Sequence, residues 1–138
     1  MGIFNTINEI KIIDFQAIHS SDALMEVFNN VSSFFHVKRI FSVKNNLINC
    51  SRGHHAHKKC EQIITCPYGA IRFKVDDGNN KKTYLIEENK YGVYIPNHIW
   101  TETTYIKKNT VLICYCSEEY DEKSYIRNYD DFIKFRKN

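Results

Sequence analysis

The sequence predicts an all-β domain, a sandwich or barrel of short strands that is followed by one C-terminal helix. Segments rich in β-branched and aromatic residues recur between turn signals, and no helical crossovers separate them. Within AIRFKV (70–75), apolar and basic residues alternate with the period of two that is typical of a sheet with one solvated face. The chain has 138 residues, of which 43% are hydrophobic, so we expect one compact domain that spans 1–138.

Seven strands are expected in the region between 36 and 116. The Asp-Gly pair within 76–80 predicts a tight hairpin and 107–109 predicts a second polar turn, so adjacent strands should be antiparallel. The expected strands are HVKRIFSV (36–43), EQIITC (61–66), AIRFKV (70–75), KTYLIE (82–87), YGVYIP (91–96), TETTYI (101–106) and TVLICYC (110–116).

The segments before and after these strands carry weaker signals. Residues 8–15 fit an edge strand, and 20–33 fit a short helix or an irregular strand equally well. Apolar residues recur at helical spacing in 124–138, which predicts a helix that packs on the outside of the strands.

Charge and hydropathy exclude several classes of protein. The net charge of +3 comes from 19 basic and 16 acidic residues spread along the chain, without the dense basic face that nucleic acids require. Apolar runs such as 111–114 are far shorter than the roughly 20 residues of a membrane span, and the N-terminus lacks a secretory pattern. From the charge and the short apolar runs we expect neither a nucleic-acid nor a membrane partner. The five cysteines lack CxxC spacing, so we expect reduced thiols in the cytoplasm.

The stretch RGHHAHKK (52–59) is the main candidate for chemistry. On a strand, His55 and His57 would point to one face and His54 to the other, so an interior-facing pair would place two imidazoles in one pocket. Neutral imidazole is suited to proton transfer near pH 7, and the pair could also bind a metal or be structural. The residue types alone leave these three alternatives open.

The spacing H-x-H-x3-E-x7-G, which includes Glu61, is close to the first motif of cupins, a superfamily of small β-barrels. Metal-binding cupins use the two histidines and the glutamate as ligands, and a second motif supplies a last histidine. Here that second motif keeps Gly92 and Pro96, but Thr101 stands where the histidine belongs. The ligand set is therefore incomplete, although three protein ligands can still hold a catalytic metal.

Three stretches together resemble the dTDP-sugar 3,4-ketoisomerase family, the WxcM-like cupins: RGHHAHKKCEQ, GVYIPNHIW and EEYDEKSYIRNYDDF. The resemblance implies a small cupin (jelly-roll-like) β-barrel with a C-terminal helix. It implies conversion of a dTDP-4-keto-6-deoxyhexose into its 3-keto isomer without metal or redox cofactor, for 3-amino-3,6-dideoxysugars of surface polysaccharides. It also implies a homodimer that exchanges N-terminal strands, and residues 8–15 are consistent with such a strand or equally with an ordinary edge strand.

The resemblance makes His55 and His57 the catalytic pair, with His55 as base and His57 as proton shuttle, or the reverse. Arg52 is expected to contact the pyrophosphate or sugar oxygens, and Arg39 to add a second contact, with a surface ion pair as its alternative. Thr101, where members usually carry a basic side chain, is a further substrate-binding candidate.

Two aromatic residues, Tyr94 and Trp100, are candidates for stacking on a sugar or thymine ring, with core packing as the alternative. The family commonly has a tyrosine where this chain has Phe41, so a phenol that could assist proton transfer is missing, and Tyr105 or Thr101 could replace it. The rival hypotheses are a metal-dependent cupin enzyme that uses His55, His57 and Glu61, and a cupin that binds nucleotide sugars without catalysis.

Overall fold

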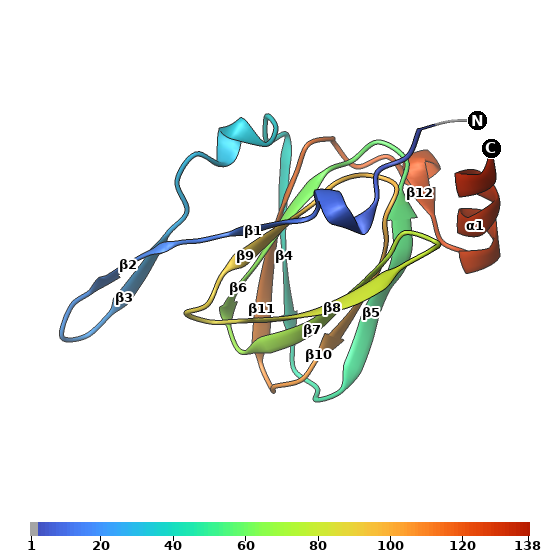
Figure 1. Cartoon of the computed structure of the whole chain (residues 1–138). Helices are drawn as coiled ribbons and strands as arrows, with labels where there is room; N and C mark the ends of the chain where they lie inside the picture. The colour runs from blue at the N-terminus through green and yellow to red at the C-terminus, as the bar shows by residue number, and fades with distance from the viewer. Residues whose placement is uncertain (1–2) are drawn as a thin grey trace.

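Two five-stranded antiparallel sheets face each other in the computed structural model, which describes residues 3–138 (Figure 1). One sheet has the strand order β1-β9-β6-β11-β4, and the other has the order β12-β5-β10-β7-β8. The bounds are β1 Lys11–Ile13, β4 Arg39–Asn45, β5 Cys50–His57, β6 Gln62–Tyr68, β7 Ala70–Asp76, β8 Lys81–Glu87, β9 Gly92–Ile95, β10 Trp100–Tyr105, β11 Thr110–Cys116 and β12 Tyr125–Ile126.

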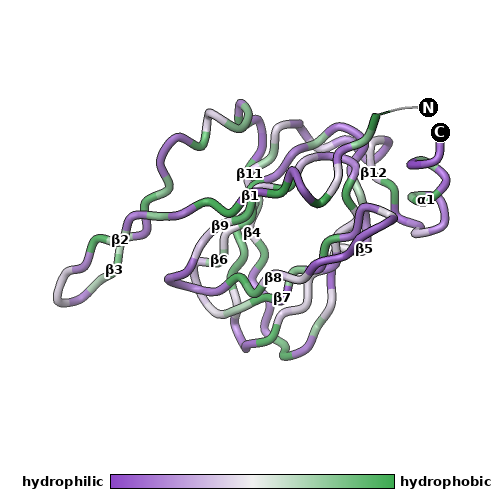
Figure 2. The backbone as a smooth tube through the Cα atoms, in the orientation of Figure 1, coloured by the Kyte–Doolittle hydropathy of each residue, from purple (hydrophilic) through white to green (hydrophobic). Residues whose placement is uncertain are grey.

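The main hydrophobic core lies between the two sheets. Ile71, Phe73 and Val75 of β7 are almost fully buried there, whereas Arg72 is exposed, so the predicted alternation is confirmed. In Figure 2 hydrophobic and hydrophilic colours follow each other along the same strands. Each sheet therefore presents one apolar face to the other.

The predicted fold class is confirmed. All seven expected strands form, and the histidine stretch adds β5 as an eighth strand in the same region. The expected hairpin joins β7 to β8 in antiparallel register, with Asp77 accepting hydrogen bonds from the backbone of Asn79 and Asn80. The two sheets keep separate hydrogen-bond ladders, so the jelly roll is a sandwich and not a closed barrel. No strand pairing joins the two sheets between β4 and the β12–β5 edge.

A projecting hairpin occupies the N-terminal region that the sequence left open. Its strands are β2 (Gln16–His19) and β3 (Leu24–Val27), and a short 3-10 helix, η2 (Val31–Ser33), follows (Figure 1). The helix alternative for 20–33 is wrong and the strand alternative holds for 24–27, because Ser20 closes a turn with Ala23 that lets the two strands pair. The expected edge strand in 8–15 forms as β1, which pairs with β9 of the same chain.

The C-terminal helix α1 (Tyr129–Lys137) packs on the outer face of the β12–β5–β10 sheet, as predicted, but it begins later than the spacing in 124–138 indicated, because Tyr125 and Ile126 pair with β5 as β12. Asn128 caps it, and Phe132 is fully buried against Ala56 and Trp100. Two further 3-10 helices are η1 (Ile7–Glu9) and η3 (Glu122–Ser124). Between residues 3 and 138, no helix combines the length and apolarity that crossing a membrane requires.

Gly69 marks the point where the chain passes from β6 in one sheet to β7 in the other. Its φ of +87° favours glycine, and a Cβ atom there would lie 2.8 Å from the Cα atom of Thr110 and nearer still to that residue's hydroxyl oxygen. The chain can therefore pass from one sheet to the other at this corner only because residue 69 is a glycine.

Replacing Gly69 by alanine should lower the free energy of unfolding by at least about 3 kcal/mol, since backbone strain and a clash with backbone add together. Gly78→Ala is the matched control, because Gly78 has a φ of +91° but faces the flexible end of Arg136 at 3.3 Å. The free energy of unfolding of Gly78→Ala should fall by about 1 kcal/mol. Urea denaturation of both variants compares them, and equal losses would contradict the argument.

Candidate active site

A β-bulge in β5 determines which side chains enter the space between the sheets. The register of β5 with β10 shifts at Gly53 and His54, so that Thr101 lies opposite His55 whereas Thr103 lies opposite Arg52. Gly53 and His54 have φ values of +91° and +50°. Because the bulge inserts one extra residue, Arg52 shares the inner face with His55 and His57, which strict alternation would have denied it.

A small hollow opens between the sheets at this point. Its volume is about 110 Å3, and His55, Arg52 and Thr101 contribute to its wall. Phe41 and Val43 of β4 line the opposite side, so the hollow lies at the seam where the two sheets are not hydrogen-bonded to each other. The remaining lining residues are Gly53, Gln62, Ile64, Phe73, Thr103, Tyr105 and Leu112.

The ring of His55 is oriented by the bulge itself. Its Nδ1 atom lies 3.0 Å from the carbonyl oxygen of Gly53, and a carbonyl only accepts, so Nδ1 carries the proton and donates it. The unprotonated Nε2 atom is then free to accept a proton. Burial is the main cause that lowers the pKa of His55, and this keeps the ring neutral at pH 7.

His57 lies deeper, with its ring centroid 4.8 Å from that of His55 and the two rings nearly perpendicular. Only 5% of the residue is exposed, and neither ring nitrogen has a hydrogen-bond partner among residues 3–138. Burial, followed by the charges of His55 and Arg39, lowers the pKa of His57 to about 3. The structure therefore brings together the two predicted histidines as a neutral, desolvated pair.

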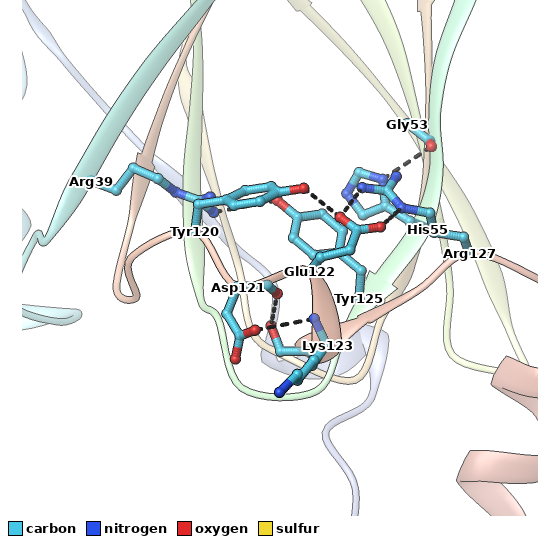
Figure 3. A network of polar contacts seen from close by, with 10 residues as sticks. Arg39, Gly53, His55, Tyr120, Asp121, Glu122, Lys123, Tyr125 and Arg127 are labelled. Atoms are coloured by element: carbon cyan, nitrogen blue, oxygen red, sulfur yellow. Dashed lines mark hydrogen bonds and ion pairs between the residues drawn. The ribbon is translucent and has the colours of Figure 1, made fainter.

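Aromatic and charged side chains gather beside His55 (Figure 3), and through Tyr125 they form a layer that covers both histidines. The Tyr125 ring centroid lies 4.5 Å from that of His57 and 5.1 Å from that of His55. Arg39 crosses the seam from β4, and its Nη2 atom donates to the Tyr125 hydroxyl at 3.5 Å. Glu122 accepts two hydrogen bonds from Arg127 and one from Tyr120.

Apart from Arg39, sequence reasoning missed these covering residues. The stretch EEYDEKSYIRNYDDF contributed to the family resemblance, but no member of it was given a role at the site. Tyr125 reaches His57 only because β12 pairs with β5, and neither spacing nor periodicity within the stretch indicates that pairing. Its aromatic and acidic residues just before the predicted helix were the only local signal.

The predicted substrate-binding residues divide into two groups. Arg52 and Thr101 line the hollow, and Arg39 lies at the seam beside it, half-buried. Trp100, in contrast, is 4% exposed and packs under α1 against Phe132, with its Nε1 atom donating to Glu102. The stacking role expected of Trp100 is therefore corrected to packing.

Tyr94 also points away from the hollow. Its ring packs against Phe34 and Phe35 in a cluster on the outer face of β9, and its hydroxyl donates to Glu61 at 2.5 Å. The packing alternative holds for this residue too. Glu61 is thereby held apart from the histidines, and residues 3–138 contain no group of three His, Cys, Asp or Glu side chains placed to hold a metal. The ligand set of the metal-dependent alternative is not assembled.

Comparison with known proteins agrees with this geometry. A model of the FdtA family, described as "WxcM-like, C-terminal", matches residues 8–137. The chain belongs to this family. The resemblance inferred from the motifs is therefore confirmed over nearly the whole chain.

Relatives of known function are isomerases of nucleotide sugars. The chain is 34% identical over 128 residues, 92% of either protein, to the TDP-4-oxo-6-deoxy-alpha-D-glucose-3,4-oxoisomerase of Aneurinibacillus thermoaerophilus. A 3,4-ketoisomerase from Helicobacter canadensis has a TM-score of 0.86 and 27% identity, with 94% of this chain and 98% of that chain covered. QdtA, a sugar 3,4-ketoisomerase of Thermoanaerobacterium thermosaccharolyticum solved with TDP, has the same TM-score and identity, covering 96% and 97%.

The buried histidines make stability depend on pH. In the unfolded chain they bind protons near pH 6.5, whereas the folded state holds them neutral to lower pH, so stability falls as the pH drops below 6.5. For His57 alone we expect a loss on the order of 2 kcal/mol between pH 6.5 and pH 5.

Urea denaturation at both pH values measures this loss. His57→Gln should reduce the difference between the two pH values, and replacing the exposed His19 by glutamine should leave it unchanged. A wild-type protein equally stable at pH 6.5 and pH 5 would contradict the assignment of a neutral pair.

Proposed function

We propose that this protein converts a TDP-linked 4-keto-6-deoxyhexose into its 3-keto isomer by acid–base proton transfer. The observation that carries the proposal is the His55 ring, which lines the hollow and is held through Nδ1 by the Gly53 carbonyl, so that Nε2 is the nitrogen left to accept a proton. The family membership and the curated relative support the same reaction. So does the histidine-to-asparagine variant of QdtA, which was solved with TDP-4-keto-6-deoxyglucose.

In the proposed reaction, Nε2 of His55 takes the proton from carbon 3, next to the ketone at carbon 4, while the oxygen on carbon 4 gains a proton, and an enediol forms. The hydroxyl at carbon 3 then loses its proton as carbon 4 gains one, so the carbonyl ends at carbon 3 and no atom is gained or lost. His57 is proposed to act as the shuttle that stores and returns a proton, because it is neutral and adjacent to His55. His55 contacts the hollow and His57 does not, which favours His55 as the base.

The size of the hollow limits what enters it. A cavity of about 110 Å3 is well below the several hundred Å3 of a typical small-molecule site, so we propose that only the sugar enters. Arg52 at the wall and Arg39 at the seam are then placed to contact pyrophosphate or sugar oxygens outside, and Thr101 to contact the sugar. Phe41 lines the hollow without a hydroxyl, and the Tyr105 and Thr101 hydroxyls remain the candidate substitutes for the family's phenol.

We further propose a cytoplasmic homodimer that exchanges N-terminal strands and serves the synthesis of surface polysaccharides, O-antigen among them. The projecting hairpin supports exchange, because its exposed apolar residues Ile18 and Met25 lie on paired strands away from the chain's own core. The five unpaired cysteines are consistent with a reducing compartment.

Replacing His55 by asparagine should lower turnover by on the order of 10² to 10⁴, because the proton acceptor is lost. The substrate is TDP-4-keto-6-deoxyglucose in deuterated water, and NMR of the product reports turnover and solvent exchange together. Thermal stabilisation by TDP should be retained in the variant. Turnover at the wild-type rate would refute the base, and TDP stabilisation of a wild-type protein without isomerisation would favour the non-catalytic binding alternative.

Arg52→Lys should raise KM by about tenfold and leave kcat within about threefold, because lysine keeps the charge but loses the planar fork that grips two oxygens. Steady-state kinetics with the same substrate measures both parameters. Lys44→Arg, an exposed position on the outer side of β4, is the matched control and should match wild type. A fall in kcat at unchanged KM would place Arg52 in the chemical step instead.

A further inference from the structure

Tyr125 is the residue that touches both imidazoles. It begins the two-residue strand β12 and lies directly opposite His57 in the pairing with β5, so the two side chains share the inner face. Its ring meets His55 and His57 edge to face, at interplanar angles of 61° in both cases. No other aromatic ring among residues 3–138 packs against both histidines.

Tyr125 is itself held from two directions. The guanidinium of Arg127 lies 4.5 Å from the centre of its ring, and Arg39 donates a hydrogen bond to its hydroxyl at 3.5 Å. Arg127 is in turn fixed by two hydrogen bonds to Glu122, at 2.6 and 2.8 Å (Figure 3). A planar, bidentate arrangement of this kind defines direction as well as distance. The ring is therefore supported by groups other than the two histidines.

The orientation of His57 depends on this ring. His55 has the Gly53 carbonyl to orient it, but both nitrogens of His57 lack hydrogen-bond partners among the described residues. Ring packing is then what remains to hold the His57 imidazole, and the same ring fills space that water would otherwise enter.

We propose that Tyr125 is a positioning residue for the His55–His57 pair, acting through its ring and not through its hydroxyl. This inference rests on the proposed ketoisomerase function, and it deepens it by adding a group that does not contact the reacting carbons. The Arg39 hydrogen bond is a support for the ring, and Glu122 and Arg127 form the second support.

Removal of the ring should change how the imidazoles titrate. The charged and titratable groups that act on them are Arg39 from β4, His54 from β5, and Glu122 and Arg127 from the segment that carries Tyr125. The cations oppose protonation and Glu122 favours it, but burial is the largest cause of the low pKa of both rings. Water admitted in place of the ring would raise both pKa values toward 6.5.

The test compares Tyr125→Phe, which keeps the ring, with Tyr125→Ala, which removes it. Tyr125→Ala should lower kcat by about 10- to 100-fold with KM within about threefold, since misplacement of a base by about 1 Å has an effect of this size. The acid limb of its kcat/KM profile should move to higher pH. Tyr125→Phe should stay within about threefold of wild type in both parameters, with an unchanged profile.

Tyr68→Ala is the matched control, because that ring is 57% exposed at the far end of β6 and touches neither histidine. It should behave as wild type. Should Tyr125→Ala fail to fold, as judged by circular dichroism, Tyr125→Leu replaces it and should lose kcat without the shift of the acid limb, since leucine restores the bulk that excludes water but not the flat ring that orients His57. A wild-type kcat in a folded Ala or Leu variant would overturn the proposal, as would an equal loss in Tyr125→Phe.

An NMR titration of the histidine rings separates this inference from the proposed function. In Tyr125→Ala the His55 and His57 resonances should titrate at higher pH than in wild type, whether or not the protein isomerises any sugar. Unchanged titrations would overturn the positioning role. Absence of isomerisation in wild type, with shifted titrations in the variant, would overturn the proposed function alone.

Discussion

The bulge at Gly53 and His54 is the constraint on which the rest of the site depends. A regular strand would send Arg52 outward, and the carbonyl of Gly53 would then pair along the ladder rather than orient His55. The extra residue instead places a cation, a base with a defined tautomer and a second imidazole on one face. Backbone geometry thus decides which nitrogen is available for chemistry.

The second requirement is that both imidazoles stay neutral, and burial and the neighbouring cations provide this together. Two protonated imidazoles at a centroid distance of 4.8 Å would repel each other, and Arg39 and Arg127 add to the cost of a first proton. The same groups carry the covering layer, so one set of side chains both excludes water and sets the protonation state. The same residues therefore determine both the shape of the site and the protonation state of the two histidines.

The sequence was sufficient for the strands between residues 36 and 116, because period-two patterns and turn residues report local backbone structure. The His55–His57 pairing followed from the same periodicity, and the motifs indicated the family. The sequence was insufficient for Tyr125, whose position depends on a pairing between strands distant in the chain. The sequence left open whether Trp100 and Tyr94 stack on a ligand or pack in the core, because an alternating strand can send an aromatic side chain to either face. The packing of Trp100 under α1 is decided only by the tertiary structure.

The seam between β4 and the β12–β5 edge has a consequence for the divergence of such enzymes. No backbone ladder crosses it, so the residues at the seam, Phe41 and Arg39 among them, can be exchanged without breaking a sheet. Selection for a different sugar can therefore act on the edge while the sandwich is inherited intact. In such a fold, the positions that change when substrate specificity changes are separate from the positions that the fold requires.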